Sequence, residues 1–120
     1  MPRAAFMVAG GLSVRMTQAI QGTLDAAVAA AGTLQSDATL LAADFSLVTT
    51  VAAGSGVILP TLVATDDMVV ANGSATASLL VYPPSGGKLN NATANLPLTL
   101  PSNRAARFIC LNTVDFICHF

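Results

Sequence analysis

From residue 33 onward, short apolar runs alternate with clusters of glycine, proline, asparagine and serine. Within the run 46–51, Leu47, Thr49 and Val51 share one face of an extended strand, and the residues between them share the other face. Such β-branched residues suit the pleated surface of a sheet. The pattern therefore predicts short β-strands at 38–41, 45–51, 57–59 and 68–70, a run that ends at residue 82, and further strands at 89–90, 96–100, 106–111 and 114–120.

Turn signals indicate how these strands connect. Asn72-Gly73 lies between two apolar runs, and the turn 83–87, with the sequence PPSGG, follows the second run. We interpret 69–82 as two strands of one sheet, closed by a rigid exposed turn that places Tyr82 and Lys88 on a display surface. About eight short strands with turns at this spacing predict an all-β domain, either a compact antiparallel β-sandwich, a jelly-roll-like fold or a barrel. No long sequence repeat is evident beyond two copies of Phe-Ile-Cys.

Residues 1–32 are expected to form an N-terminal arm that precedes a β domain of residues 33–120. In the second half of this arm, apolar residues recur at helical spacing from Ile20 to Val28, whereas Gly22 disfavours a helix. Residues 17–32 therefore fit either a short helix or an extended segment.

The first sixteen residues carry apolar side chains between Arg3 and Arg15. They fit two descriptions, a disordered terminus or a tail that orders against a neighbouring subunit. Gly10-Gly11 interrupts the apolar run and no clear small-residue cleavage site follows it, which argues against a cleaved signal peptide.

The amino-acid composition indicates that the domain contacts other protein chains. The chain is 53% apolar and 9% charged, whereas soluble domains average about 25% charged residues. Such a chain must cover its surface with small polar residues or bury part of that surface against other chains, and we expect both. A net charge of -1, with no basic residue between Arg15 and Lys88, excludes the basic footprint of a nucleic-acid-binding protein. No apolar run is long enough to predict a transmembrane helix.

No stretch of the chain carries convincing catalytic, cofactor-binding or metal-binding chemistry. His119 is the only histidine and lies in an apolar run, which favours a packing or interface role. Cys118 and His119 should point to opposite faces of a strand, so they cannot readily share a metal. Asp66-Asp67 lacks the ligand series of a calcium loop and is interpreted as a solvated turn. Cys110 and Cys118 are too few for a disulfide framework and are interpreted as free thiols.

Six segments carry a common pattern of strands and turns: LVTTVAAG (47–54), GVILP (56–60), MVVANG (68–73), LVYPP (80–84), GGKLN (86–90) and LTLP (98–101). Through them, the region from Phe45 to Phe120 resembles small structural proteins of tailed bacteriophages. The resemblance covers about two-thirds of the chain and leaves the N-terminal arm without a counterpart. Phe116 departs from the pattern, because a tryptophan is expected in the last strand.

The resemblance implies a β domain displayed on virions. A capsid decoration (cement) protein of this kind binds the major capsid protein, stabilises the capsid lattice as a homo-trimer or homo-dimer, and is no enzyme. It would lie on the capsid surface of the virion after assembly in the host bacterial cytoplasm, with no cofactor and no contact with nucleic acid or membrane. The alternative is a phage tail or fibre module for assembly or host-receptor binding. A small hydrolase or carbohydrate-binding enzyme domain is a third interpretation, which the absence of glutamate and the single histidine disfavour.

Seven residues are candidates for the interface of such a protein. Those in the arm are expected to contact the capsid or to link subunits, with the arginines pairing with acidic residues. Those in the closing hairpin are expected at an inter-subunit surface together with Phe108 and Phe116, for which core packing is the alternative. The seven candidates are Arg3, Phe6, Met7, Arg15, Tyr82, Arg107 and Phe120.

Overall fold

The computed structural model describes residues 23–119, which form nine β-strands, one short 3-10 helix and no α-helix. The expected all-β class is therefore confirmed for this part of the chain, and no helix in it has the length and apolar character to cross a membrane. The elements are β1 (Leu24–Ala29), η1 (Gln35–Asp37), β2 (Thr39–Leu40), β3 (Phe45–Thr50), β4 (Gly56–Ile58), β5 (Asp67–Asn72), β6 (Leu79–Tyr82), β7 (Leu98–Leu100), β8 (Ala105–Cys110) and β9 (Phe116–His119).

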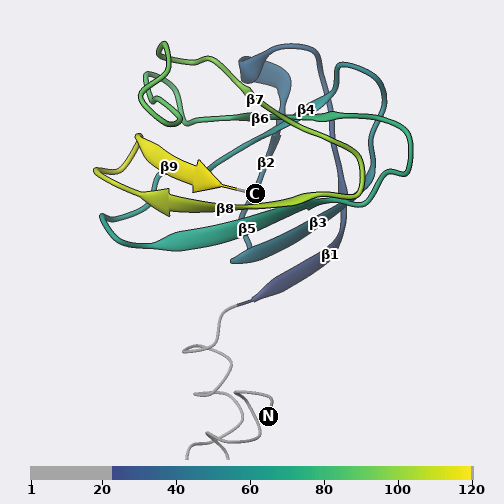
Figure 1. The fold of residues 1–120 in the computed structure, drawn as a ribbon, viewed down its shortest axis with the longest axis horizontal. Coiled ribbons are helices and arrows are strands. Elements are labelled where there is room, and N and C mark those ends of the chain that lie inside the picture. Colours follow the sequence, from purple (N-terminus) through teal and green to yellow (C-terminus); the bar gives the residue numbers. More distant parts are fainter. Residues whose placement is uncertain (1–22, 120) are drawn as a thin grey trace, which may run out of the picture.

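The strands form two mixed sheets that lie one above the other in Figure 1. Sheet A has the order β1-β3-β5-β8-β9, and sheet B has the order β2-β4-β6-β7. The expectation of an antiparallel architecture was wrong, because β1, β3 and β5 pair in parallel, as do β2, β4 and β6. After each of the strands β1 to β5 the chain crosses to the other sheet, and so it returns to the first sheet in the same direction.

Each passage through both sheets makes one rung, and three rungs stack: β1 with β2, β3 with β4, and β5 with β6. Leu24 pairs with Phe45, which pairs with Val69, and the same relation joins Val57 to Val81 in sheet B. Paired positions recur after 21 and 24 residues in sheet A and after 18 and 24 residues in sheet B, close to the period of stacked repeats. β1 begins at Leu24, so the sheets include residues that the expected boundary at residue 33 had placed in the arm.

In sheet A, the end of the stack opposite β1 is closed. β8 runs antiparallel to β5 and β9 antiparallel to β8. The segment from Lys88 to Asn90 then covers the outer edge of β9. Phe116 N donates to Lys88 O at 2.9 Å, and Asn90 N donates to Phe116 O at 2.9 Å. The Asn90 side chain continues the ladder, because its Oδ1 accepts from Cys118 N at 2.8 Å and its Nδ2 donates to Cys118 O at 3.1 Å.

The core lies between the two sheets and follows the alternation of the strands. In β5 and β8 every second residue is buried, and Phe108 and Phe116 belong to the core. For these two phenylalanines, core packing is therefore the observed role. The predicted pairing within 69–82 was wrong, because β5 lies in sheet A and β6 in sheet B. The buried Asn72 side chain joins the two, donating from Nδ2 to Ala77 O at 2.8 Å and to Leu100 O at 3.1 Å.

Candidate interaction surface

The outer face of sheet A brings together exposed and half-buried apolar side chains from five strands. On β3, β5, β8 and β9 the residues that alternate with the buried ones point away from the core. Strand register aligns Leu24, Phe45 and Val69 in one row across three strands. The row continues through Arg107 of β8 and His119 of β9, so it crosses the whole sheet.

Most of this face is apolar. Phe45 is 40% exposed, Ile117 is 43% exposed and Leu24 is 66% exposed. A sheet that is apolar on both faces is typically covered by another layer on each of them. No element of residues 23–119 forms such a layer beneath sheet A in Figure 1. The exposed or half-buried apolar members of the outer face are Leu24, Phe45, Leu47, Val69, Ala71, Ala105, Ile109 and Ile117.

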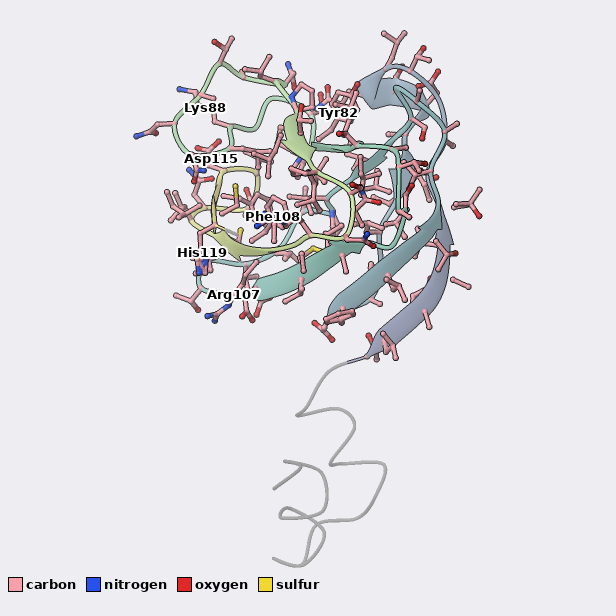
Figure 2. The ribbon with its side chains drawn as sticks, turned by 45° about the vertical axis from the view of Figure 1, so that its right-hand side comes forward. Tyr82, Lys88, Arg107, Phe108, Asp115 and His119 are labelled. Atoms are coloured by element: carbon pink, nitrogen blue, oxygen red, sulfur yellow. The ribbon has the colours of Figure 1, made fainter. Side chains whose placement is uncertain are left out.

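Charged groups lie within this face at one side. Arg107 donates from Nε to Asp67 Oδ2 at 2.7 Å, and its terminal nitrogen lies 2.7 Å from the same oxygen. The pair is exposed, so it contributes only about 0 to 1 kcal/mol to stability. Its effect is to hold the guanidinium in place beside the apolar row. Figure 2 shows Arg107 and His119 close together at the same side of the sheet.

The outer face of sheet B differs because the chain covers it around Tyr82, although Leu40 on the same face is 66% exposed. The Tyr82 ring lies over Gly56, where an added Cβ would come within 2.8 Å of Tyr82 Cε2. Tyr82 Oη donates to Thr33 O at 3.4 Å, and Gln35 Nε2 donates to Pro83 O at 2.8 Å. The connection between β1 and β2 therefore holds Tyr82 against the sheet, and only 7% of that residue is exposed. The prediction that Tyr82 lies on a display surface was wrong.

The seven predicted interface residues do not form one site in the described structure. Tyr82 and Arg107 lie on different sheets, and only Arg107 is exposed. The other five, Arg3, Phe6, Met7, Arg15 and Phe120, lie outside the described residues. Sequence reasoning missed Phe45 and Ile117 as members of an exposed face. The available signal was that Leu47-Val48 of β3 and the first three residues of β9 are apolar at consecutive positions, so each strand has apolar side chains on both faces.

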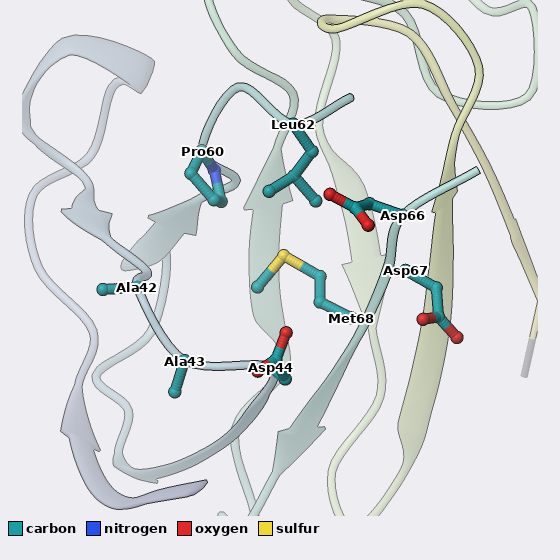
Figure 3. Close-up of a pocket in the computed structure, with 8 residues that line it drawn as sticks. All are labelled: Ala42, Ala43, Asp44, Pro60, Leu62, Asp66, Asp67 and Met68. Carbon is teal, nitrogen blue, oxygen red and sulfur yellow. The ribbon is translucent and has the colours of Figure 1, made fainter. Parts of the chain in front are cut away.

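A small pocket lies beside sheet A, at the edge where the chain passes from β4 to β5 (Figure 3). Its volume is about 80 Å³, whereas pockets for small-molecule ligands have roughly 300 to 1,000 Å³. Three carboxylates, of Asp44, Asp66 and Asp67, line it, but Asp67 is already paired with Arg107. Among the described residues no group of three or more histidine, cysteine or acidic side chains could hold a metal ion.

Both cysteines are free and buried, as expected for Cys110 and Cys118. Cys110 lies opposite Phe116 across the hairpin, and Cys118 lies opposite Phe108. Burial raises the pKa of the Cys118 thiol, and the hydrogen bond from Asn90 opposes this effect. Cys118 points into the core while its neighbour His119 is exposed, which confirms that the two side chains lie on opposite faces.

Comparisons of the chain with protein-family models, with curated proteins and with solved structures found no match.

Proposed function

We propose that the protein is a structural protein of a bacteriophage virion, a capsid decoration protein that acts as a homo-oligomer on the capsid lattice. The observation that carries this proposal is the apolar outer face of sheet A, which the described part of its own chain leaves uncovered. The resemblance of residues 45–120 to small virion proteins supports a role in a bacteriophage particle. The low content of charged residues suits large protein–protein contacts.

The outer face of sheet A serves as the contact between copies of the chain. Phe45, Val69 and Ile117 provide apolar area in a flat array, and each fully buried side chain of this size contributes about 1.5 to 3 kcal/mol. The Arg107–Asp67 pair beside them sets the orientation of the second copy, since misplaced like charges oppose binding. A two-fold or three-fold arrangement around this face yields a closed oligomer.

Decoration then follows from binding alone. An oligomer that contacts several major capsid subunits binds the assembled shell and has no such site on free subunits. It therefore stabilises the shell by mass action, in proportion to its concentration relative to its dissociation constant. No step of this function requires a catalytic group, a cofactor or a metal ion.

A tail or fibre module is the second candidate, and the stacked rungs favour it. Three parallel rungs extend along one direction, so a module of this kind adds length by repetition. In that role the same outer face would join neighbouring fibre strands.

Capsid binding tests the proposal. Expanded capsids of the phage that encodes the chain are mixed with the full-length protein and sedimented. Saturable co-sedimentation, lost on Ile117→Asp and retained on Leu111→Asp, is the expected result. Leu111 is a matched control because it is equally exposed but lies at a hairpin tip. Density confined to the tail in electron micrographs of the virion, with no binding to capsids, would favour the fibre module and overturn decoration.

A further inference from the structure

The two ends of the rung stack are finished differently. In sheet A, the end opposite β1 is covered, because the Lys88–Asn90 segment hydrogen-bonds along the edge of β9; in sheet B, β7 is the last strand at that end. At the other end, β1 and β2 are the terminal strands of sheets A and B, and neither has an outer partner among residues 23–119. The first rung is therefore an open end, a feature that stacked-repeat proteins normally cover with a capping segment.

Exposure changes step by step along the stack. Leu40 of the first rung is 66% exposed, its partner Ile58 is half-buried, and Tyr82 of the third rung is 7% exposed. In sheet A, exposure falls from 66% at Leu24 to 40% at Phe45. A residue on the first rung is exposed because it lacks one neighbouring strand. One further rung would bring Leu24 and Leu40 to the burial of their second-rung partners.

We propose that residues 1–22 of the same chain dock on this open end and cap it. Their length is the first reason, because residues 1–22 are enough for one rung, and paired positions of successive rungs lie 18 to 24 residues apart. Their point of attachment is the second reason. Thr23 is fixed at the start of β1, where its backbone nitrogen donates to Asp44 Oδ2 at 2.9 Å and its carbonyl accepts from Phe45 N at 2.9 Å.

Charge provides the third reason. Residues 1–22 contain Arg3 and Arg15 and no acidic residue. The first rung and its connection to β3 contain Asp25, Asp37 and Asp44, all exposed, and no basic residue. The segment and the open end therefore have opposite charge. Apolar side chains between the two arginines, including Phe6 and Met7, are available to cover the exposed leucines.

The edge itself favours a tethered segment over the edge of a second copy. The register of β1 with β3 is irregular between Asp25 and Ala29. Bulged edge strands resist pairing with strands of other molecules. A segment of the same chain meets the edge at a high effective concentration that a separate molecule lacks. This inference does not depend on the proposed function in virions.

Photo-cross-linking of the full-length chain tests the site. Phe6 is replaced by a benzophenone amino acid, and equal amounts of light-isotope and heavy-isotope chains are mixed before irradiation. The expected cross-links join position 6 to residues 24–41 and carry a single isotope. Cross-links to β9 or to β3, β5 and β8 of sheet A, mixed-isotope products, or the absence of cross-links would each overturn the proposal.

Hydrogen exchange of the full-length chain tests the charge argument. In the Arg3→Asp/Arg15→Asp variant, the backbone amides of Leu24–Ala29 should exchange about tenfold faster than in the wild type, because the cap is released. Arg104→Asp is the matched control, since Arg104 is exposed and lies outside the first rung. It should leave these amides unchanged. Equal exchange in the double variant and the wild type would contradict capping.

Discussion

The outer faces of the two sheets both carry apolar residues, but they differ in how far the chain itself covers them. On sheet B, Tyr82 lies across Gly56 and is held by the β1–β2 connection through Thr33 and Gln35. On sheet A, Phe45 and Ile117 lie on a face that the described chain leaves bare. The difference teaches that apolar content alone does not separate core from interface. An apolar sheet face becomes buried within the chain only if a segment of the chain can reach it. For the outer face of sheet A, we propose that a second copy of the chain provides the cover instead.

The largest expected effect comes from comparing substitutions on the two faces of sheet A, on adjacent strands. Phe108→Ala removes a fully buried ring from the inner face and should lower the free energy of unfolding by about 3 to 5 kcal/mol. Ile117→Ala on the outer face should change it by about 0.5 kcal/mol or less in the monomer. Denaturant unfolding at low protein concentration measures both. Equal losses would mean that the outer face is covered within the chain.

Tyr82→Ala removes the cover of sheet B. The expected loss is about 3 kcal/mol, because a large buried ring is replaced by a cavity or by exposed apolar strand. The variant should also bind a hydrophobic dye more strongly than the wild type, as Ile58 and Leu80 become accessible. Tyr82→Phe keeps the ring and should lose about 1 kcal/mol or less. A dye response from Tyr82→Phe equal to that of Tyr82→Ala would contradict the role given to the ring.

Ser46 tests whether the inner face of sheet A is built to be apolar. Its buried hydroxyl has no hydrogen-bond partner among the described residues. Ser46→Ala should therefore raise the free energy of unfolding by about 1 kcal/mol. Ser55→Ala is the matched control, because Ser55 Oγ donates to Ala52 O at 2.7 Å, and its removal should lower stability. A destabilised Ser46→Ala would show that the hydroxyl has a partner outside residues 23–119.

The smallest expected effect is a pH dependence from Cys118, which lies on the opposite face of β9 from Ile117. Burial raises the pKa of this thiol above its ordinary value of 9.0 in the folded chain. The unfolded chain therefore loses the proton first as pH rises, and stability falls above about pH 9. Unfolding measured from pH 7 to 10 should show a steeper fall for the wild type than for Cys118→Ala. Parallel curves would contradict the burial of the thiol.

Local patterns predicted much of the strand content of this fold. Alternation and turn residues located β3, β6, β8 and β9 within a few residues. The parallel order of the first three rungs escaped prediction, because a strand carries no local mark of its partner's direction. One signal was present. Val28-Ala-Ala-Ala-Gly32 begins at the end of β1 and Val51-Ala-Ala-Gly54 follows β3, and both glycines adopt positive φ, at 69° and 78°. This short repeat marks the same corner of successive rungs.

The candidate surface was harder to predict than the strands. Arg107, a predicted interface residue, is exposed. Tyr82 was placed on the surface because tyrosine is common at interfaces, and its burial depends on Gly56, which comes next to it only through pairing of β4 with β6. Phe45 and Ile117 are more than 70 positions apart in the chain. Only the order of the strands in sheet A places them on one face.

Light scattering of the full-length protein during size-exclusion chromatography tests the central claim most directly. Each chain has a mass of 12.1 kDa. The wild type should elute as a dimer or trimer, and Phe45→Asp and Ile117→Asp should elute as folded single chains. Val63→Asp, at an exposed position between β4 and β5, should keep the wild-type mass. A wild type that remains a single chain at all concentrations, or face variants that keep the oligomer, would contradict the assignment of the outer face of sheet A as the contact between copies.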